Sequence, residues 1–225
     1  MRTARRALLR HLFVAFGATI ALSVATTARA DLLTFSFTGT VDSVDAPLAA
    51  TFSAGQSLSG TYTFDSTTVA RAGSNSNFAA YDALTHVDFT VGGYSASSAG
   101  AQEIQVDNDP GAPFFDRYSI LSRASDGLTG AAVAGLALDS FGFRLDDSTN
   151  TVFTDALILP TTLNLADFNN RQFFIFFNDS AGAPSVVSGT ITSLRPVPEP
   201  SALLLTVVGG ISGLGLWRRQ RRRIA

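Results

Sequence analysis

Hydrophobic and polar residues alternate over short stretches along most of the chain, with the two-residue period of half-buried β-strands. The clearest stretches are residues 33–38, 58–64 and 87–91. Clusters of Gly, Pro, Asn, Asp and Ser separate such stretches. The same criteria predict further strands at 103–106, 115–121, 131–138, 141–145, 173–177 and 186–194. The chain therefore predicts an all-β domain of about ten short strands.

The pattern also indicates how the strands are arranged. Many short antiparallel strands favour a β-sandwich of jelly-roll type. Residues 173–177 are apolar on both faces, which predicts a central strand covered on each side or packed against neighbouring elements. Residues 163–168 are expected to form one helical turn, and no long amphipathic helix is visible. Gly-Thr pairs open strands at residues 39, 60 and 189, but their unequal spacing does not predict a solenoid repeat.

The N-terminus has the organisation of a signal peptide. An apolar stretch, residues 12–24, follows four arginines and precedes Ala28-Arg29-Ala30. Small residues at positions −3 and −1 are what signal peptidase requires. We therefore expect residues 1–30 to be removed and the mature chain to begin at Asp31.

The C-terminus has the organisation of a membrane anchor. Residues 201–217 are free of charge, and as a helix they would span about 25 Å, slightly less than a hydrocarbon core of about 30 Å. By the positive-inside rule, the basic residues that follow stay in the cytoplasm, so the domain would face the periplasm. These residues are Arg218, Arg219, Arg221, Arg222 and Arg223. Pro196, Pro198 and Pro200 predict an extended, exposed approach to this span.

The tail resembles a PEP-CTERM sorting signal, a family also known as the ice-binding protein C-terminal domain. The resemblance covers residues 197–225 and rests on the motif Val197-Pro198-Glu199-Pro200, the Gly-rich span and the arginine cluster, in that order. It implies recognition by exosortase, a membrane-embedded cysteine transpeptidase that cuts near the Pro-Glu-Pro motif. The expected organisation is a signal peptide at 1–30, a passenger domain at 31–195 and a sorting signal at 196–225. Residues 60–65, 87–93 and 116–118 also resemble a β-rich passenger that precedes many such tails, which implies no activity.

The charge of the passenger domain limits the kinds of partner that it can bind. Residues 31–200 contain six Arg and all eighteen acidic residues, a formal charge of −12. This balance argues against binding of nucleic acid or of an anionic leaflet, and favours divalent cations or cationic partners. The chain has no Cys, so disulfides, thiolate metal sites and cysteine nucleophiles are excluded.

No catalytic constellation is predicted, and we do not expect an enzyme. The mature chain has no Lys or Cys, so His86 is the only candidate base of a nucleophile system. His86 and Asp88 would share the solvent face of their strand, because Val87 and Phe89 occupy the core face. A pair of carboxylates for glycoside hydrolysis is always available among sixteen Asp, which removes its weight as evidence.

Two binding functions stay open. Asp107, Asp109 and the nearby Asp116 offer hard oxygen ligands for Ca²⁺ around a turn, although Asp, Asn, Pro and Gly also form plain turns, and Asp146-Asp147 is a weaker alternative. Carbohydrate binding usually relies on exposed Trp or Tyr, but Trp217 lies in the tail and Tyr62 is expected in the core, so Tyr81, Tyr94 and Tyr118 remain. The leading hypothesis is an exported, non-enzymatic protein for adhesion or assembly in the exopolysaccharide matrix.

Overall fold

A computed structural model describes residues 32–109 and 115–198. Strands dominate these residues, and their helical elements are three single turns, none of which could span a bilayer. The strands are β1 (Leu32–Val44), β2 (Ser57–Asp65), β3 (Phe78–Val91), β4 (Tyr94–Asp109), β5 (Phe115–Arg123), β6 (Leu128–Gly130), β7 (Ala137–Asp147), β8 (Asn170–Asn178) and β9 (Pro184–Pro196). The turns are η1 (Ala46–Leu48), η2 (Ala124–Asp126) and η3 (Leu165–Asp167).

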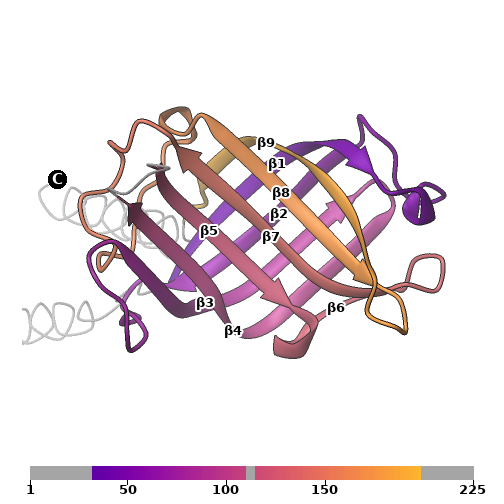
Figure 1. The fold of residues 1–225 in the computed structure, drawn as a ribbon, viewed down its shortest axis with the longest axis horizontal. Coiled ribbons are helices and arrows are strands. Elements are labelled where there is room, and N and C mark those ends of the chain that lie inside the picture. The colour runs from indigo at the N-terminus through magenta and orange to yellow at the C-terminus, as the bar shows by residue number, and fades with distance from the viewer. Residues whose placement is uncertain (1–31, 110–114, 199–225) are drawn as a thin grey trace, which may run out of the picture. The chain divides into compact units, whose positions relative to one another are not determined.

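Eight of the strands close into one antiparallel barrel (Figure 1). Each strand pairs with the next along the chain, except that β5 pairs with β7, while the short β6 adds to the other part of β4. Pairing of β1 with β9 closes the ring. The all-β prediction is confirmed, but the predicted sandwich of jelly-roll type is wrong. Both architectures bury one face of every strand, so the alternation of residues does not distinguish them.

Aromatic side chains fill the barrel. Phe89 and Phe141 stack with their ring centroids 4.2 Å apart, and Phe37 packs against Phe141 and Phe143. The glycines of the Gly-Thr pairs make room for such rings. A Cβ atom at Gly60 would lie 2.5 Å from the ring of Phe37, its register partner. The rings and glycines together give a close-packed interior.

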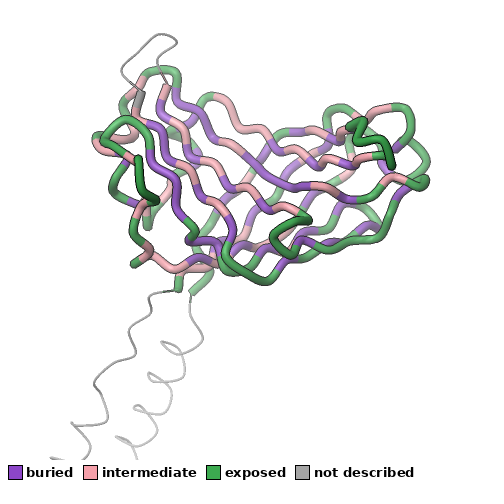
Figure 2. The backbone as a smooth tube through the Cα atoms, turned by 60° about the horizontal axis from the view of Figure 1, so that its bottom comes forward, coloured by how far each residue is buried: buried purple, intermediate pink, exposed green. Residues whose placement is uncertain are grey.

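The barrel has two ends with different contents (Figure 1). We call one the terminal end, because Leu32 and Pro198 lie there with loops 66–77 and 148–169. The other, the distal end, carries segments 45–56, 124–136 and 179–183. Buried residues run along the strands, and the loops at both ends are largely exposed (Figure 2).

Each end is closed by side chains from its loops. At the distal end Phe52 packs against Tyr94 and Phe177. At the terminal end Ala156 and Phe168 are buried, and the Tyr81 hydroxyl donates a hydrogen bond of 2.6 Å to the Ala156 carbonyl. The interior is therefore a packed core closed at both ends.

Most predicted strands are confirmed, with three corrections. The strand predicted at 131–138 is wrong, because residues 131–136 form a turn region that contains only the isolated bridge Val133–Leu136. The first halves of β3 and β4 were not predicted, since Ala and Ser there obscure the alternation. Phe174 and Phe176 are only half-buried on the outside of the barrel, so β8 is not covered on both faces, but it is packed between β7 and β9, the other predicted alternative. The helical turn predicted at 163–168 is confirmed as η3.

Candidate functional site

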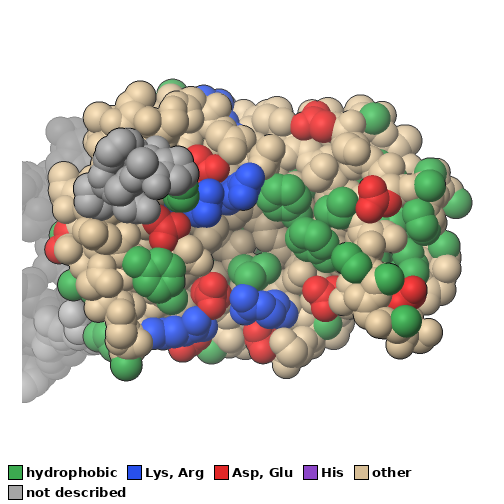
Figure 3. Space-filling model, in the orientation of Figure 1, with side chains coloured by type: hydrophobic (Ala, Val, Ile, Leu, Met, Phe, Trp, Pro, Cys, Tyr) green, Lys and Arg blue, Asp and Glu red, His purple; other side chains and the backbone are tan. Residues whose placement is uncertain are grey.

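A groove follows the outer face of β7. Its floor is Ser140 and Gly142, which have small or no side chains. Ser140 lies between Arg123 of β5 and Phe176 of β8 in the sheet register. Gly142 lies between Leu121 of β5 and Phe174 of β8. Figure 3 shows this face hollowed over β7, with hydrophobic and arginine side chains around the hollow.

The floor residues Ser140 and Gly142 are themselves buried, and the missing side chain at Gly142 has a structural cause. A Cβ atom at this position would lie 2.6 Å from the carbonyl oxygen of Ile120. Because this oxygen belongs to the backbone of the sheet, it cannot move away as the end of a side chain could. The strands thus exclude a side chain at position 142 itself, and Leu121 Cδ1 lies 3.4 Å from where its Cβ atom would be. Larger side chains on β5 and β8 then stand above the floor as walls.

The β8 wall of the groove is aromatic. The rings of Phe174 and Phe176 stack with centroids 6.1 Å apart, and both side chains are half-buried. The guanidinium of Arg144 lies over the Phe174 ring, 5.4 Å from its centroid. Its Nη2 donates a 2.7 Å hydrogen bond to Oε1 of Gln172. The wall therefore presents ring surface beside fixed polar groups.

Asp146 organises the polar side chains at the end of the groove. Its Oδ1 accepts a hydrogen bond of 2.6 Å from Arg117 Nε, and its Oδ2 accepts one of 3.0 Å from Asn170 Nδ2. Arg144 Nε is 3.6 Å from the same Oδ2. Both oxygens of this carboxylate are thus occupied, and its role is to position the arginines.

Arginine is concentrated on this side of the barrel. The described residues contain six Arg, and four of them lie in β5, β7 and β8: Arg117, Arg123, Arg144 and Arg171. The acidic domain thus carries most of its positive charge on the strands that form the groove. This distribution was not predicted, since it depends on which strands become neighbours.

A second acidic feature lies inside the barrel at the terminal end. Asp116 and Asp147 are register partners on β5 and β7, and both are buried. Asp116 Oδ2 accepts 2.7 Å hydrogen bonds from the amides of Val152 and Phe153, which fastens loop 148–169 to the barrel. Asp116 Oδ1 is buried without a hydrogen-bond partner in the part of the chain that the structure describes.

The two carboxyls have opposite electrostatic surroundings. Burial raises the pKa of Asp116, and the Asp147 charge adds to this, against the two amide hydrogen bonds. Burial alone would also raise the pKa of Asp147. Hydrogen bonds from Thr149 and Thr151 outweigh that effect, and the pKa of Asp147 is lowered. Both groups are enclosed by loop 148–169, so they do not form an open site.

The structure separates two of the three residues predicted to bind calcium, Asp107 and Asp116. Asp116 lies two residues from buried Tyr118, on the inner face of β5, whereas Asp107 is adjacent to buried Val106 and belongs to the outer face of β4. Asp109 is the register partner of Phe115. Within residues 32–109 and 115–198 no group of three or more His, Asp or Glu side chains is arranged to hold a metal ion. Asp146 and Asp147 are adjacent in β7, so their side chains point to opposite faces of the strand.

His86 occupies the predicted solvent face. The side chains of His86 and Asp88 are both nearly half exposed, and His86 Nε2 is 3.5 Å from Asp88 Oδ2. Val87 and Phe89 are buried, as predicted. The pair lies on an open strand surface, and the other side-chain contact of Asp88 is a hydrogen bond from Thr61.

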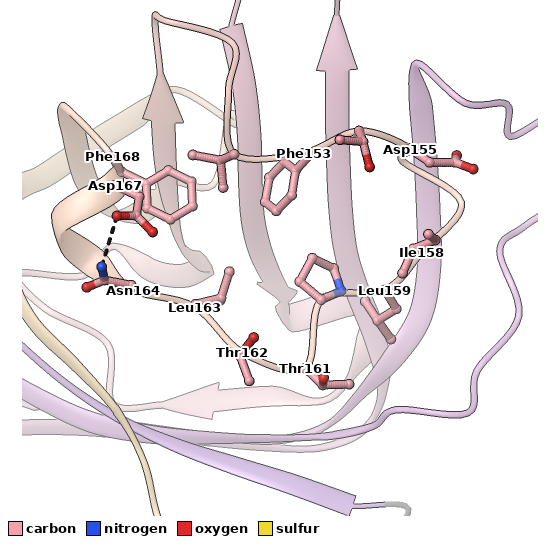
Figure 4. Close-up of a pocket in the computed structure, with 13 residues that line it drawn as sticks. Phe153, Asp155, Ile158, Leu159, Thr161, Thr162, Leu163, Asn164, Asp167 and Phe168 are labelled. Atoms are coloured by element: carbon pink, nitrogen blue, oxygen red, sulfur yellow. Dashed lines mark hydrogen bonds between the residues drawn. The ribbon is translucent and has the colours of Figure 1, made fainter.

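Loop 148–169 also encloses a pocket of about 520 Å³ (Figure 4). Phe153 lies on one side of the pocket, and Thr161 and Thr162 lie on the other. Its two acidic residues serve the loop itself. Asp155 accepts from the Leu157 amide at 2.9 Å, and Asp167 accepts from Asn164 Nδ2 at 2.9 Å. We assign no chemistry to this pocket.

The predicted processing residues lie mostly outside the described part of the chain. This applies to the signal sequence with Ala28, Ala30 and Asp31, to Glu199 and Pro200, and to the span and arginine tail. Val197 and Pro198 are described and exposed. The Val197 amide donates a 2.8 Å hydrogen bond to the Thr34 carbonyl, which extends the β1–β9 pairing by one step.

The fold places the described chain among closed, antiparallel β-barrels with a filled interior. Comparisons with known protein families, with curated proteins and with solved structures found no match. The proposed function therefore rests on the groove and on the two ends of the chain.

Proposed function

We propose that this chain is an exported, non-enzymatic adhesion protein that binds a polysaccharide segment in the β7 groove. The main observation behind this proposal is that the small residues Ser140 and Gly142 lie beside the aromatic wall of Phe174 and Phe176. A sugar ring places its C–H face against an aromatic face, and its hydroxyls need hydrogen-bonding groups nearby. Arg144 and Gln172 supply such groups at the same wall. The groove thus offers the aromatic contact that the buried tyrosines do not provide.

The arginines favour an acidic sugar within this class. Carboxylates of a polyuronate would meet guanidinium groups on β5 and β7, where Arg123 and Arg144 lie beside the floor. Arg123 is 3.8 Å from Asp126 and 3.9 Å from Glu103, so its exposed guanidinium is only loosely paired. Binding to such sites weakens as salt screens the charges.

Two observations support a binding role without catalysis. Glycoside hydrolysis requires two available carboxyls about 5–10 Å apart across the substrate. In the groove, both oxygens of Asp146 are held by Arg117 and Asn170. The buried pair Asp116 and Asp147 lies on the opposite, inner side of the sheet. Asp107 and Asp116, two of the predicted calcium ligands, lie on opposite faces of the sheet, so the adhesion proposal does not include a metal.

For delivery, we propose export with removal of residues 1–30 by signal peptidase and processing at the tail by exosortase. The support is the PEP-CTERM resemblance, together with the place where the barrel ends. Pro196 closes β9, the Val197 amide makes the last described hydrogen bond, and Pro198 is exposed. The motif thus begins where the barrel's hydrogen bonding stops. This arrangement leaves the complete barrel on the outer side of the cut, for the cell surface or matrix.

Affinity electrophoresis tests adhesion. The full-length chain, in a detergent without sugar headgroups, is run through gels containing alginate as a polyuronate or dextran as a neutral glycan. We expect retardation by alginate that salt weakens, and loss of most of it in Phe174→Ala and Arg144→Gln. Phe78→Ala is the matched control, since it truncates an exposed Phe outside the groove. Equal retardation of Phe174→Ala and Phe78→Ala would contradict binding in the groove.

Mass spectrometry tests delivery. The chain is expressed with and without exosortase, and the C-terminus of the mature product is determined. We expect a cut near Pro198–Pro200 only with exosortase, and its loss when these three residues are replaced by Ala. An intact arginine tail in exosortase-containing cells would overturn the sorting proposal.

A further inference from the structure

The exposed hydrophobic side chains of the barrel gather at one end. Six large hydrophobic residues of the described chain are exposed, and all six lie at the terminal end: Leu32, Val69, Phe78, Leu157, Ile158 and Val197. Val69 and Ile158 are 83% and 64% exposed. The distal end also consists of loops, but Leu48 and Phe52 there are buried in the core. The asymmetry is therefore a property of the terminal end rather than of loops in general.

The apolar residues come from separate parts of the chain. Val69 belongs to loop 66–77, Phe78 begins β3, and Leu157 and Ile158 belong to loop 148–169. The Ala156 amide donates a 2.8 Å hydrogen bond to the Ser76 carbonyl, which joins the two loops. The hydrogen bond from the Tyr81 hydroxyl also fixes the Ala156 carbonyl to the barrel. The loops are thus fixed to each other, with their apolar residues turned to the same end.

The chain leaves the barrel at this same end. Pro198 is the last described residue, and the predicted membrane span begins at Ser201. Three extended residues reach at most about 10 Å. Resting on the proposed function, in which residues 201–217 cross the membrane, the terminal end is then held within about 10 Å of the bilayer surface. No other surface of the barrel is tied so closely to the predicted span.

We propose that the terminal end docks on the lipid surface while the tail is anchored, with Val69, Leu157 and Ile158 entering the boundary between headgroups and acyl chains. Loops 66–77 and 148–169 contain only three charged residues, Arg71, Asp155 and Asp167. Arg71 is paired with Asp82 and Glu103. The surface therefore fits zwitterionic lipid through apolar contact, and has no basic cluster for anionic lipid. Docking sets the barrel upright, with the β7 groove on its side and clear of the membrane.

Single cysteines test the docking, because the natural chain has none. The full-length chain carrying Val69→Cys or Ile158→Cys is labelled with a polarity-sensitive fluorophore and reconstituted in phosphatidylcholine vesicles that contain lipids with brominated acyl chains. Ser180→Cys at the distal end is the matched control, since it is also an exposed loop position. We expect brominated lipid to quench the labels at 69 and 158 at least twofold more than the label at 180.

Vesicle flotation in the same samples separates docking from anchoring. Floating protein with equal quenching at positions 69, 158 and 180 overturns docking and leaves the anchor intact. Protein that does not float overturns both. Labels at 69 and 158 that are shielded from water without lipid quenching, increasingly at high protein-to-lipid ratio, mean that a second copy covers this end, which also overturns lipid docking.

Discussion

The ring of Phe173 in β8 covers Gly189, its register partner in β9, and leaves no room for a side chain there. A Cβ atom at Gly189 would lie 2.5 Å from this ring and would overlap the Thr40 carbonyl oxygen on the other side. One contact is with backbone, so side-chain rearrangement cannot relieve it.

Replacement of Gly189 by Ala is therefore expected to destabilise the barrel by about 1–3 kcal/mol, the usual cost of overpacking. Urea unfolding followed by fluorescence measures the change. Gly93→Ala is the matched control, because no atom lies within 4 Å of a Cβ at Gly93. An equal effect of the two substitutions would show that the ring and the Thr40 carbonyl do not restrict position 189.

Asp116 and Asp147 are expected to shape the pH dependence of stability in opposite directions. The folded pKa of Asp116 is raised, so ionisation is less favourable in the folded state, and stability falls as the pH rises through that pKa. The folded pKa of Asp147 is lowered. Its contribution is present above the unfolded pKa of about 3.9 and is lost as the pH falls.

Melting temperatures of Asp116→Asn and Asp147→Asn between about pH 3 and 7 test this sign. Relative to the natural chain, Asp116→Asn should gain stability as the pH rises, whereas Asp147→Asn should lose it. Asp116→Ala should be destabilised by about 1–3 kcal/mol throughout, because the amides of Val152 and Phe153 lose their acceptor. Parallel curves for the two Asn variants would contradict the opposite pKa shifts.

The tyrosines are expected to resist ionisation in the folded chain. Burial raises the pKa of Tyr94 to about 12, and it also raises the pKa values of Tyr62 and Tyr118 above their usual value. Ultraviolet titration should therefore detect little tyrosinate near pH 10 until the barrel unfolds. The urea-unfolded chain is the control and should titrate near pH 10. Half ionisation of folded protein near pH 10 would place these rings in water.

Tyr62 and Tyr118 also make a testable pair inside the barrel. Their hydroxyls are 3.5 Å apart and both side chains are fully buried. Each single change to Phe should cost about 1 kcal/mol, since it leaves the other hydroxyl unpaired. The double variant Tyr62→Phe/Tyr118→Phe should cost less than the sum of the two. Additive costs in denaturant unfolding would show that the hydroxyls do not interact.

The sequence predicted the strands well because one side of most of them is buried. Leu58, Tyr62 and Phe64 alternate as expected and all lie in the core. Closure into a barrel was not predictable in the same way, since it depends on the pairing of β1 with β9. Thr38 and Thr192, hydrogen-bonded across that pairing, are 154 positions apart.

The candidate groove needed information that one strand does not contain. Ser140 and Gly142 become a floor only because Leu121, Phe174 and Phe176 stand on the neighbouring strands. The same limitation explains why the calcium prediction placed Asp107 and Asp116 in one site. Asp107 and Asp116 are close in sequence, but the register of β4 and β5 assigns them to opposite faces of the sheet.

The pairing of β1 with β9 also sets the order of events when the chain folds. In the proposed export, β1 has no partner on one edge until β9 has followed it through the translocon, so the ring would close only after the whole barrel has crossed. The hydrogen bonding that completes it ends at Val197, which is the first residue of the proposed sorting motif. A protease that pulled on this motif would open the last rung of the barrel, and strand β9 would resist. In the proposed sorting, processing and folding would therefore compete for the same few residues.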